Sequence, residues 1–420
     1  MTRRIALVAQ NPGLPFVFEA AGRAGCLITL IALPGVRVAD GLPNVEQVVV
    51  LDIFGDPGGA HAWLESRHAS QPFDAIVTLY EAAGPFTAEA AARMGLRGVD
   101  QEAARICRDK YRQRDAMRKA GLDVPGYRLI DPVADIGGQV TDLRFPLVVK
   151  PVNGLSSQGV SRADDVAGLK AAVDLVQSIN AEQLDVFAGA SHAERTGVLA
   201  EEFIDGPEYC VEAVSGPRGT TVLAITDKGN LQGPYFEERT FITPAPLDPD
   251  TAARITGAVC AAHRQIGIDF GASHSELRLR ADGTPVLLEI GARMGGSGTV
   301  HFLVETATGV DFLGAVLNQA ITGVLPDLRP AHQAFAADWI VPVTGHGEYA
   351  GLAGAEEVRR HPATRMLLEL MRPGAVVPAW PRFAGYPAFV LSAHQSYQDC
   401  HAYQAWLEDT IRVAWAGTAG

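Results

Sequence analysis

Short apolar runs alternate with helical patterns through the first hundred residues. The runs are rich in β-branched side chains and cover residues 5–9, 27–32, 48–51 and 75–79. Strands and helices in alternation predict a parallel sheet with helices on its faces. No Gly-x-Gly-x-x-Gly follows the first run, so a dinucleotide site is not expected. The polar strand ends at 10–11 and 80–81 are still placed to line a ligand crevice, as in other open α/β sheets.

Beyond residue 100 the spacing of apolar residues becomes that of a helix. The spacing of apolar residues predicts a helix from Gln101 to Ala120, with Asp100 as its N-cap and Gly121 as its stop. Lys110 lies beside the apolar line, at the edge of the buried face. A solvated charge is the ordinary interpretation of such a lysine, and a side chain that reaches into a site is the other.

A second lysine stands at the end of a strand. Residues 145–151 form a buried-type run that contains Lys150, and a Gly/Ser-rich turn follows at 152–160. A strand, a lysine and such a turn together can hold phosphates through backbone N–H groups, hydroxyls and a point charge. The lysine precedes the glycines, so this is not a Walker A loop. A flexible hairpin is the commoner interpretation of the turn taken alone.

The next strands carry an unusual number of acids. The two runs that flank the turn at 205–207 contain four glutamates, namely Glu201, Glu202, Glu208 and Glu212. The pattern fits a solvated sheet edge, or groups that form hydrogen bonds to a base and a ribose. Further strands near 221–226 and 235–242 continue an antiparallel sheet.

Residues 271–291 predict a hairpin with two facing carboxylates. Asp282-Gly283 between alternating runs is a strong signal for a two-residue turn. Counting outward from that turn places Glu276 directly opposite Glu289. The carboxylate face is predicted to hold His274, Glu276, Arg278, Leu287, Glu289 and Gly291, and the core face Leu277, Leu279, Val286, Leu288 and Ile290.

Facing carboxylates with Cβ atoms roughly 5 Å apart repel one another, so a cation is expected between them. Arg278, on the same face, is one candidate. Mg²⁺ is the other, because this hard ion takes carboxylates and leaves room for substrate phosphates. The residues after Glu289 favour the metal, since a small-residue loop at 291–296 contains Arg293, whose guanidinium can bind phosphate or carboxylate. The combination suggests phosphoryl transfer.

Composition narrows the choice of partner and location. The 420 residues suffice for two or three domains. A net charge of −13 argues against nucleic acid or an anionic membrane as partner. The five cysteines are scattered without a CxxC pair, so neither disulfides nor zinc are indicated. No apolar run approaches membrane-spanning length, and a cytoplasmic protein without nucleic-acid or membrane partners is expected.

Five segments, taken in order, resemble the ATP-grasp superfamily, and more narrowly its carboxylate–amine ligases of the L-amino acid (dipeptide) ligase type. They are DK (109–110) with AGLDVP (120–125), VKP (149–151) with SSQGV (156–160), EEFIDGPE (201–208), HSE (274–276) and EIGARMGG (289–296). The fold that this resemblance implies is α/β and α+β multidomain. It comprises an N-terminal Rossmann-like parallel-sheet domain (1–100), an ATP-grasp domain (101–325) with a mobile lid at about 125–200, and a small C-terminal α+β domain (326–420).

The resemblance also implies roles for individual residues. Lys110 and Lys150 would bind the phosphates of ATP and, with Arg293, act in catalysis. Glu276 and Glu289 would ligate Mg²⁺, with Mn²⁺ as a substitute. The remaining ATP-binding residues would be the loop Ser156, Ser157, Gln158, Gly159 and Val160, the adenine segment Glu201, Glu202, Phe203 and Ile204, and Glu208 at the ribose.

For the substrates, the resemblance implies a carboxylic acid and an amine, joined through an acyl phosphate with release of ADP and phosphate. We expect Arg293, Gly295 and Gly296 to hold a carboxylate, and Glu238 and His274 to lie near the amine. Alternatives are a carboxylase that uses carboxyphosphate, a phosphotransferase, or a non-catalytic nucleotide-binding protein. The resemblance to that branch implies a possible homodimer. The residues themselves do not determine the oligomeric state.

The chain departs from the branch at one motif. Phe241 stands where the branch's histidine would be, although Glu238 keeps the acid that precedes it. Glu237 and Arg239 add charges of their own. Gly291, two residues after the second metal glutamate, matches the dipeptide-ligase branch rather than the asparagine of many other members. The departures bear on the substrate and not on the ATP chemistry.

Overall fold

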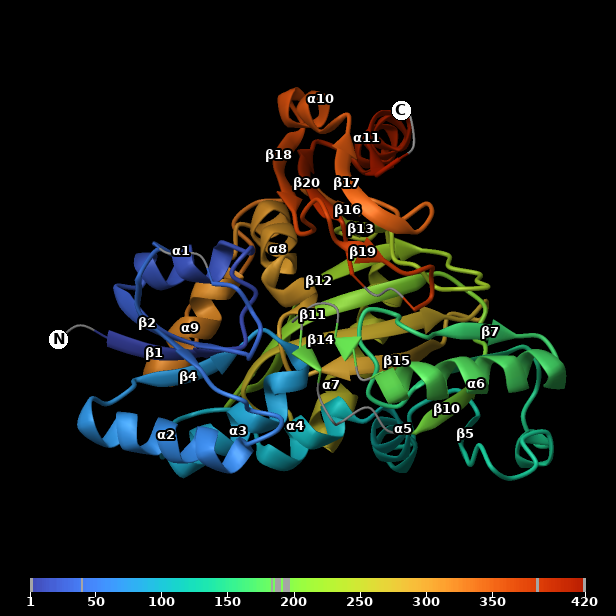
Figure 1. The fold of residues 1–420 in the computed structure, drawn as a ribbon, viewed down its shortest axis with the longest axis horizontal. Helices are drawn as coiled ribbons and strands as arrows, with labels where there is room; N and C mark the ends of the chain where they lie inside the picture. The colour runs from blue at the N-terminus through green and yellow to red at the C-terminus, as the bar shows by residue number, and fades with distance from the viewer. Residues whose placement is uncertain are drawn as a thin grey trace.

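The computed structural model describes residues 3–38, 41–182, 184–185, 190–191, 197–382 and 385–417. These residues form an N-terminal parallel sheet, a small antiparallel sheet and a large antiparallel sheet that continues into the C-terminal region (Figure 1). No single helix in the described ranges is long and apolar enough to cross a membrane. The helices Val300–Thr308 (α8) and Phe312–Thr322 (α9) meet the length and composition criteria only as a pair, and they are bent by 108°.

The predicted N-terminal parallel sheet is confirmed. Its four strands lie in the order β3-β2-β1-β4, and all neighbouring pairs are parallel. Helices α2 and α3 run along one side of this sheet and α1 along the other, where α9 also packs (Figure 1). The elements are β1 (Arg3–Val8), α1 (Phe16–Arg23), β2 (Cys26–Ala32), β3 (Val45–Val50), α2 (Pro57–Ser70), β4 (Ala75–Thr78) and α3 (Gly84–Arg93).

The helix predicted over 101–120 is wrong in one respect, because it is two helices. Asp109 separates α4 (Gln101–Arg108) from α5 (Lys110–Lys119), with non-helical backbone angles of φ −121° and ψ 104°. Its carboxylate accepts a hydrogen bond from the backbone N–H of Arg112 at 2.9 Å, so it caps a new helix instead of continuing the old one. Lys110 is therefore the first residue of α5 and is buried.

The small antiparallel sheet has the order β5-β10-β6-β7 and is covered by a single long helix, α6. Its elements are β5 (Tyr127–Ile130), β6 (Leu147–Pro151), β7 (Ser161–Ala163), α6 (Val166–Glu182) and β10 (Val198–Glu202), with the short pair β8 (Leu184–Asp185) and β9 (Ala190–Ser191) beside them. These elements lie in the range for which a mobile lid is predicted, and β10 extends slightly beyond that range. Part of that lid (183, 186–189 and 192–196) falls outside the described residues.

The large sheet has eight strands in the order β15-β14-β11-β12-β13-β16-β20-β18, and helix α7 packs on the face of its first strands. Strands β16, β18 and β20 come from residues after 325, so the sheet crosses the predicted domain boundary without a break. Its elements are β11 (Glu208–Gly216), β12 (Gly219–Gly229), β13 (Thr240–Thr243), α7 (Pro249–Ile266), β14 (Gly271–Leu279), β15 (Pro285–Gly291), β16 (Phe335–Ile340), β18 (Thr364–Glu369) and β20 (Ala388–His394).

The remaining C-terminal elements cover the outer part of this sheet (Figure 1). A three-stranded sheet of order β19-β17-β21 packs there with two helices. These elements are β17 (Gly347–Ala353), α10 (Ala355–Arg360), β19 (Val376–Val377), α11 (Tyr397–Thr410) and β21 (Arg412–Trp415).

The hairpin of β14 and β15 has the predicted carboxylate pair but not the predicted turn. Arg280 and Thr284 close a three-residue turn, through an N–H to carbonyl bond of 3.0 Å. A bulge farther along then shifts the register, and Glu276 faces Glu289 after all. Because two residues oppose one at a bulge, the leucines exchange faces. Leu287, predicted beside the carboxylates, lies in the core, and Leu288, predicted in the core, lines a cavity.

Candidate active site

One cavity is bordered by the N-terminal parallel sheet, the small antiparallel sheet and the large antiparallel sheet. The strand end at Tyr80-Glu81 borders it as predicted, whereas the 10–11 strand end does not. Of the predicted site residues, Gly159 and Gly295 alone do not line it. The lining residues among them are Lys110, Lys150, Ser156, Ser157, Gln158, Val160, Glu201, Glu202, Phe203, Ile204, Glu208, Glu238, His274, Glu276, Glu289, Arg293 and Gly296.

The two predicted lysines lie in this cavity, each held by a carboxylate. The Lys110 ammonium lies 2.9 Å from Glu289 Oε1 and donates to the carbonyl of Gly154 at 2.8 Å. The Lys150 ammonium lies 2.5 Å from Glu201 Oε2. Burial lowers the pKa of Lys150, and Glu201 opposes that shift. Lys110 is thus a cavity residue and not a solvated charge.

Glu201 has a second partner that the sequence reasoning missed. Arg114 is fully buried, and its Nε lies 2.5 Å from Glu201 Oε1. Burial alone would raise the pKa of Glu201, but Arg114 and Lys150 together hold it below its ordinary value. Arg114 follows Lys110 by four residues, which places the two on the same side of α5. Once Lys110 is taken as a site residue, that spacing points to Arg114.

Arg278 is not the cation between the facing carboxylates of Glu276 and Glu289. That residue binds Glu208 at 3.0 Å and the carbonyl of Ile204 at 3.0 Å, so the interpretation in which it neutralises the pair is wrong. Burial favours the neutral form of both glutamates. Lys228 and His274 nevertheless hold the pKa of Glu276 well below its ordinary range, whereas burial raises the pKa of Glu289 despite Lys110. The Lys110 ammonium does not fully offset the cost of burying the Glu289 carboxylate. Two facing carboxylates with such a deficit of positive charge form a donor set that suits Mg²⁺.

Lys228 is a further residue that the sequence reasoning missed. Its ammonium contacts three carboxylates, those of Glu208, Glu238 and Glu276, at 2.7, 2.6 and 3.0 Å. Burial alone would lower its pKa, but these carboxylates outweigh burial and hold the pKa well above its ordinary value. Lys228 follows the buried Ala224 and Thr226 at two-residue spacing, so the three lie on the same face of β12. A lysine at a position that alternation assigns to the buried face of a strand could have indicated this residue from the sequence.

Arg293 is anchored by the N-terminal domain. Its guanidinium pairs with Glu81 and donates to the carbonyl of Met294 at 3.2 Å. Glu81 also lies 3.8 Å from Arg108. Burial would raise the pKa of Glu81, but the cations around it, Arg293 first, lower the pKa below its ordinary value. The strand end at 80–81 therefore contributes the carboxylate that positions Arg293.

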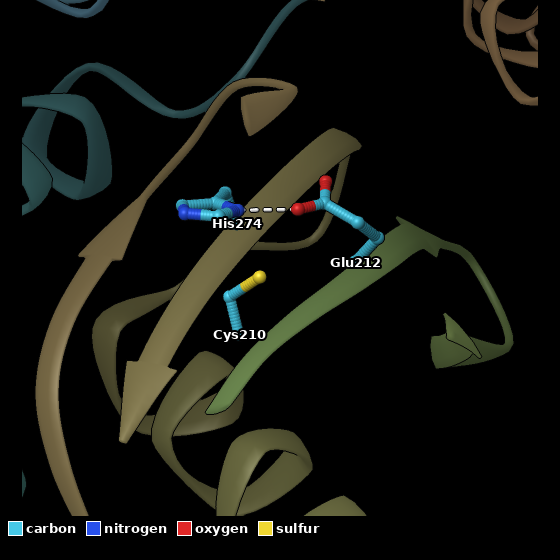
Figure 2. A group of neighbouring side chains, drawn as sticks. All are labelled: Cys210, Glu212 and His274. Carbon is cyan, nitrogen blue, oxygen red and sulfur yellow. Dashed lines mark hydrogen bonds and ion pairs between the residues drawn. The ribbon is translucent and has the colours of Figure 1, made fainter. Parts of the chain in front are cut away.

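His274 lies between two glutamates. Figure 2 shows its ring facing the Glu212 carboxylate, with Cys210 beside them; the ring's other nitrogen lies 3.3 Å from Glu276 Oε1. Burial alone would lower the pKa of His274, but Glu212 raises it to about 9. The ring is therefore a cation at neutral pH and orients Glu276. A Cβ added to Gly295 would lie 2.5 Å from His274 Nδ1, so a side chain here would displace the imidazole ring.

The Ser156–Ser157 loop is tied to the C-terminal region. Ser156 and Ser157 have positive φ angles of 50° and 55°. Gly159 N–H donates to the carbonyl of Pro381 at 3.0 Å, and the Gln158 amide donates to the carbonyl of Arg382 at 2.7 Å. The loop is thereby held over the cavity, where it can exclude water.

The predicted adenine segment borders the same cavity. Phe203 and Ile204 line it together with Leu288, the bulge residue. The backbone N–H of Glu202 already donates to the carbonyl of Gly126 at 2.8 Å, so contact of Glu202 with a base would be through its carbonyl oxygen. Apolar walls with polar groups at their edge suit a flat, polar-edged ligand.

Comparison with known proteins identifies the family. Models of the ATP-grasp domain and of the ATP-grasp N-terminal domain match residues 143–301 and 18–98. An uncharacterized protein of Sinorhizobium fredii is 32% identical over 54% of this chain and 44% of its own length. Alanine–anticapsin ligase of Bacillus subtilis is 29% identical over 61% of this chain and 55% of its own length. The chain thus spans about half the length of these two relatives.

A solved structure extends the likeness to the whole chain. The L-amino acid ligase from Bacillus licheniformis is 36% identical, superimposes with a TM-score of 0.86, and is matched over 99% of both chains. The expected ATP-grasp fold, with its N-terminal parallel sheet, is thereby confirmed. The chain belongs to the ATP-grasp superfamily and, within it, to the same family as this L-amino acid ligase.

Proposed function

We propose that this protein joins an amino acid or another small carboxylic acid to an amine, using ATP and forming an acyl phosphate. A carboxylate does not react with amines at neutral pH. Transfer of the γ-phosphoryl group to a carboxylate oxygen gives an acyl phosphate and ADP. The amine then attacks the acyl carbon, the C–O bond to phosphate breaks, and an amide, phosphate and a proton are released. Such a reaction depends mainly on positioning and electrostatics.

The observation that carries the proposal is the facing pair Glu276 and Glu289, with Lys110, Lys150 and Arg293 in the same cavity. Glu276 and Glu289 would hold Mg²⁺, or Mn²⁺ in its place, which would neutralise charge on the phosphates. Lys110 and Lys150 would bind the phosphate oxygens as point charges. Arg293, kept in place by Glu81, would stabilise the charge on the transferred phosphoryl group.

The rest of the cavity supports the remaining roles. Glu202, Phe203 and Ile204 would contact the base. The ribose would approach Glu208, whose carboxylate is fixed by Arg278 and Lys228. The loop at 156–160, tied to the C-terminal region, would exclude water, because an acyl phosphate hydrolyses readily. We place the reaction in the cytoplasm, where ATP is available.

The acid and the amine would bind on the side of the ATP phosphates that faces away from the base and the ribose. We propose that Arg293 and the 295–296 loop hold a carboxylate and that Glu238 and His274 lie near the amine. Phe241, which replaces the branch's histidine, is 9% exposed and lines the cavity. An apolar wall stands here where an imidazole would offer a hydrogen bond, so the acid and amine are expected to differ from those of proteins that keep the histidine.

ADP release tests the proposal directly. Purified protein with Mg²⁺-ATP is incubated with amino acids and other small acids and amines, singly and in pairs. We expect ADP release that requires two components, together with their condensation product by mass spectrometry. Glu289→Gln removes one metal carboxylate at constant size and should lower the rate about 100-fold or more. Glu356→Gln, an exposed residue of α10, is the matched control.

Other outcomes point to the alternatives. Release that depends on bicarbonate would indicate a carboxylase, and a stable phosphorylated product from one component would indicate a phosphotransferase. ATP binding without release for any pair would contradict the ligase proposal.

A further inference from the structure

Asp338 is a buried carboxyl that lines the cavity and that no role above uses. It lies in β16, directly opposite Phe241 of β13 and Leu391 of β20. The side chain is 3% exposed, and what remains accessible of it borders the cavity at the end formed by the C-terminal region. No motif in the sequence marks this residue.

Asp338 differs from the other acids of this end in having no partner. Its Oδ1 is buried without a hydrogen bond, and within the described residues no cation pairs with its carboxyl group. Its neighbour Glu238 is satisfied, by the Lys228 ammonium at 2.6 Å and by the Tyr386 hydroxyl at 3.0 Å. A carboxylate buried in this way is costly unless it is protonated or paired. A group that pairs with the ionised form of Asp338 would therefore have to come from outside the described residues.

The surroundings define the chemistry of that group. Phe241, Ile340 and Phe389 provide apolar walls beside Asp338. Asp338 and Glu238 are both acids, so this end favours a positively charged group. A group that fits is a small cation carried on a short apolar stem.

We propose that Asp338 binds a primary ammonium group carried by the carboxylic-acid substrate. The inference rests on the proposed function in one respect, namely that the acid enters this cavity. The ammonium can be the α-ammonium of an amino acid or one at the end of its side chain, and both would donate hydrogen bonds to the same carboxylate. Asp338 would then select acids that carry an amine over acids that lack one.

The protonation state of Asp338 agrees with this assignment. Burial, with the negative charge of Glu238 adding to it, raises the pKa of Asp338 to about 8. The carboxyl therefore holds a proton near neutral pH when no ligand is present. An arriving ammonium would displace that proton and form a charge-assisted pair.

Four six-carbon acids test the proposal by calorimetric binding in the presence of Mg²⁺ and β,γ-imido-ATP. L-Lysine carries both amines, L-norleucine only the α-amine, 6-aminohexanoate only the terminal amine, and hexanoate neither. We expect L-lysine to bind the wild type at least about tenfold more tightly than hexanoate. L-Norleucine shares that preference if the α-ammonium is recognised, and 6-aminohexanoate shares it if the side-chain ammonium is.

Asp338→Asn keeps the size of the side chain and should abolish the preference, leaving all four acids bound as weakly as hexanoate. Binding of β,γ-imido-ATP should stay within about twofold of wild type, a result that a general structural defect would not give. Asp409→Asn, an exposed change on α11 in the same region of the chain, should behave like wild type.

Three results would overturn the inference: an unchanged preference in Asp338→Asn, hexanoate binding as tightly as L-lysine, or no binding of any of the four to the wild type. The ADP-release assay is read separately. Ligase activity combined with any of these three results would reject the role of Asp338 and leave the proposed function standing.

Discussion

Replacing Arg293 by alanine is expected to lower kcat about 10²- to 10³-fold, with the KM for ATP changed only a few-fold. Arg293 follows the facing glutamates, Glu276 and Glu289, on a small-residue loop, and Glu81 fixes its guanidinium beside the cavity. A preorganised cation at the transferred phosphoryl group stabilises charge that is largest in the transition state, so its loss appears in kcat.

The measurement is steady-state ADP release with the acid and amine found in the substrate survey. Arg293→Lys keeps the charge but loses the planar fork, and should recover part of the rate. Arg264→Ala, an exposed change on α7, serves as the control. A kcat close to wild type in Arg293→Ala, or a loss confined to the KM for ATP, would remove Arg293 from the chemical step.

Replacing Lys228 by methionine is expected to lower the free energy of unfolding by about 3–5 kcal/mol. The change leaves one buried carboxylate, that of Glu208, and two half-buried ones, those of Glu238 and Glu276, without their shared ammonium. Glu208 keeps Arg278 and Glu276 keeps His274, whereas among the described residues Glu238 keeps only the Tyr386 hydroxyl. Most of the loss should therefore come from Glu238.

Urea denaturation measures this loss and its origin. The double variant Lys228→Met with Glu238→Gln should recover most of the stability, because the uncompensated charge is gone. Lys170→Met, an exposed change on α6, should cost less than about 0.5 kcal/mol. If Lys228→Met costs less than about 1 kcal/mol, or if Glu238→Gln gives no recovery, the ammonium does not hold these carboxylates together.

The sequence was sufficient for the features that depend on local pattern. Alternation in the first hundred residues predicted the parallel sheet, and counting along the hairpin predicted that Glu276 faces Glu289. Glu276 does face Glu289, but the path of the chain between them differs from the predicted hairpin. The turn has one residue more than expected, and a bulge at Leu288 compensates for it.

The error in the helix and the omitted site residues have different causes, a local cap in the first case and contacts with distant segments in the second. Helical spacing continues through Asp109, but the cap formed by its side chain ends one helix and begins another. Lys228, Arg114 and Asp338 became interpretable only with their neighbours in place. Their partners, or the lack of one, are set by strands and helices from other parts of the chain, and no local pattern encodes those contacts.

Formation of an acyl phosphate requires that a carboxylate oxygen attack ATP, and isotope transfer follows that oxygen. The acid is labelled with ¹⁸O in its carboxylate and incubated with Mg²⁺-ATP and the amine. If an acyl phosphate forms, one labelled oxygen leaves with each phosphate, and the amide retains the other. We predict phosphate that carries one ¹⁸O atom for every amide formed. Unlabelled phosphate, or AMP in place of ADP, would contradict the account.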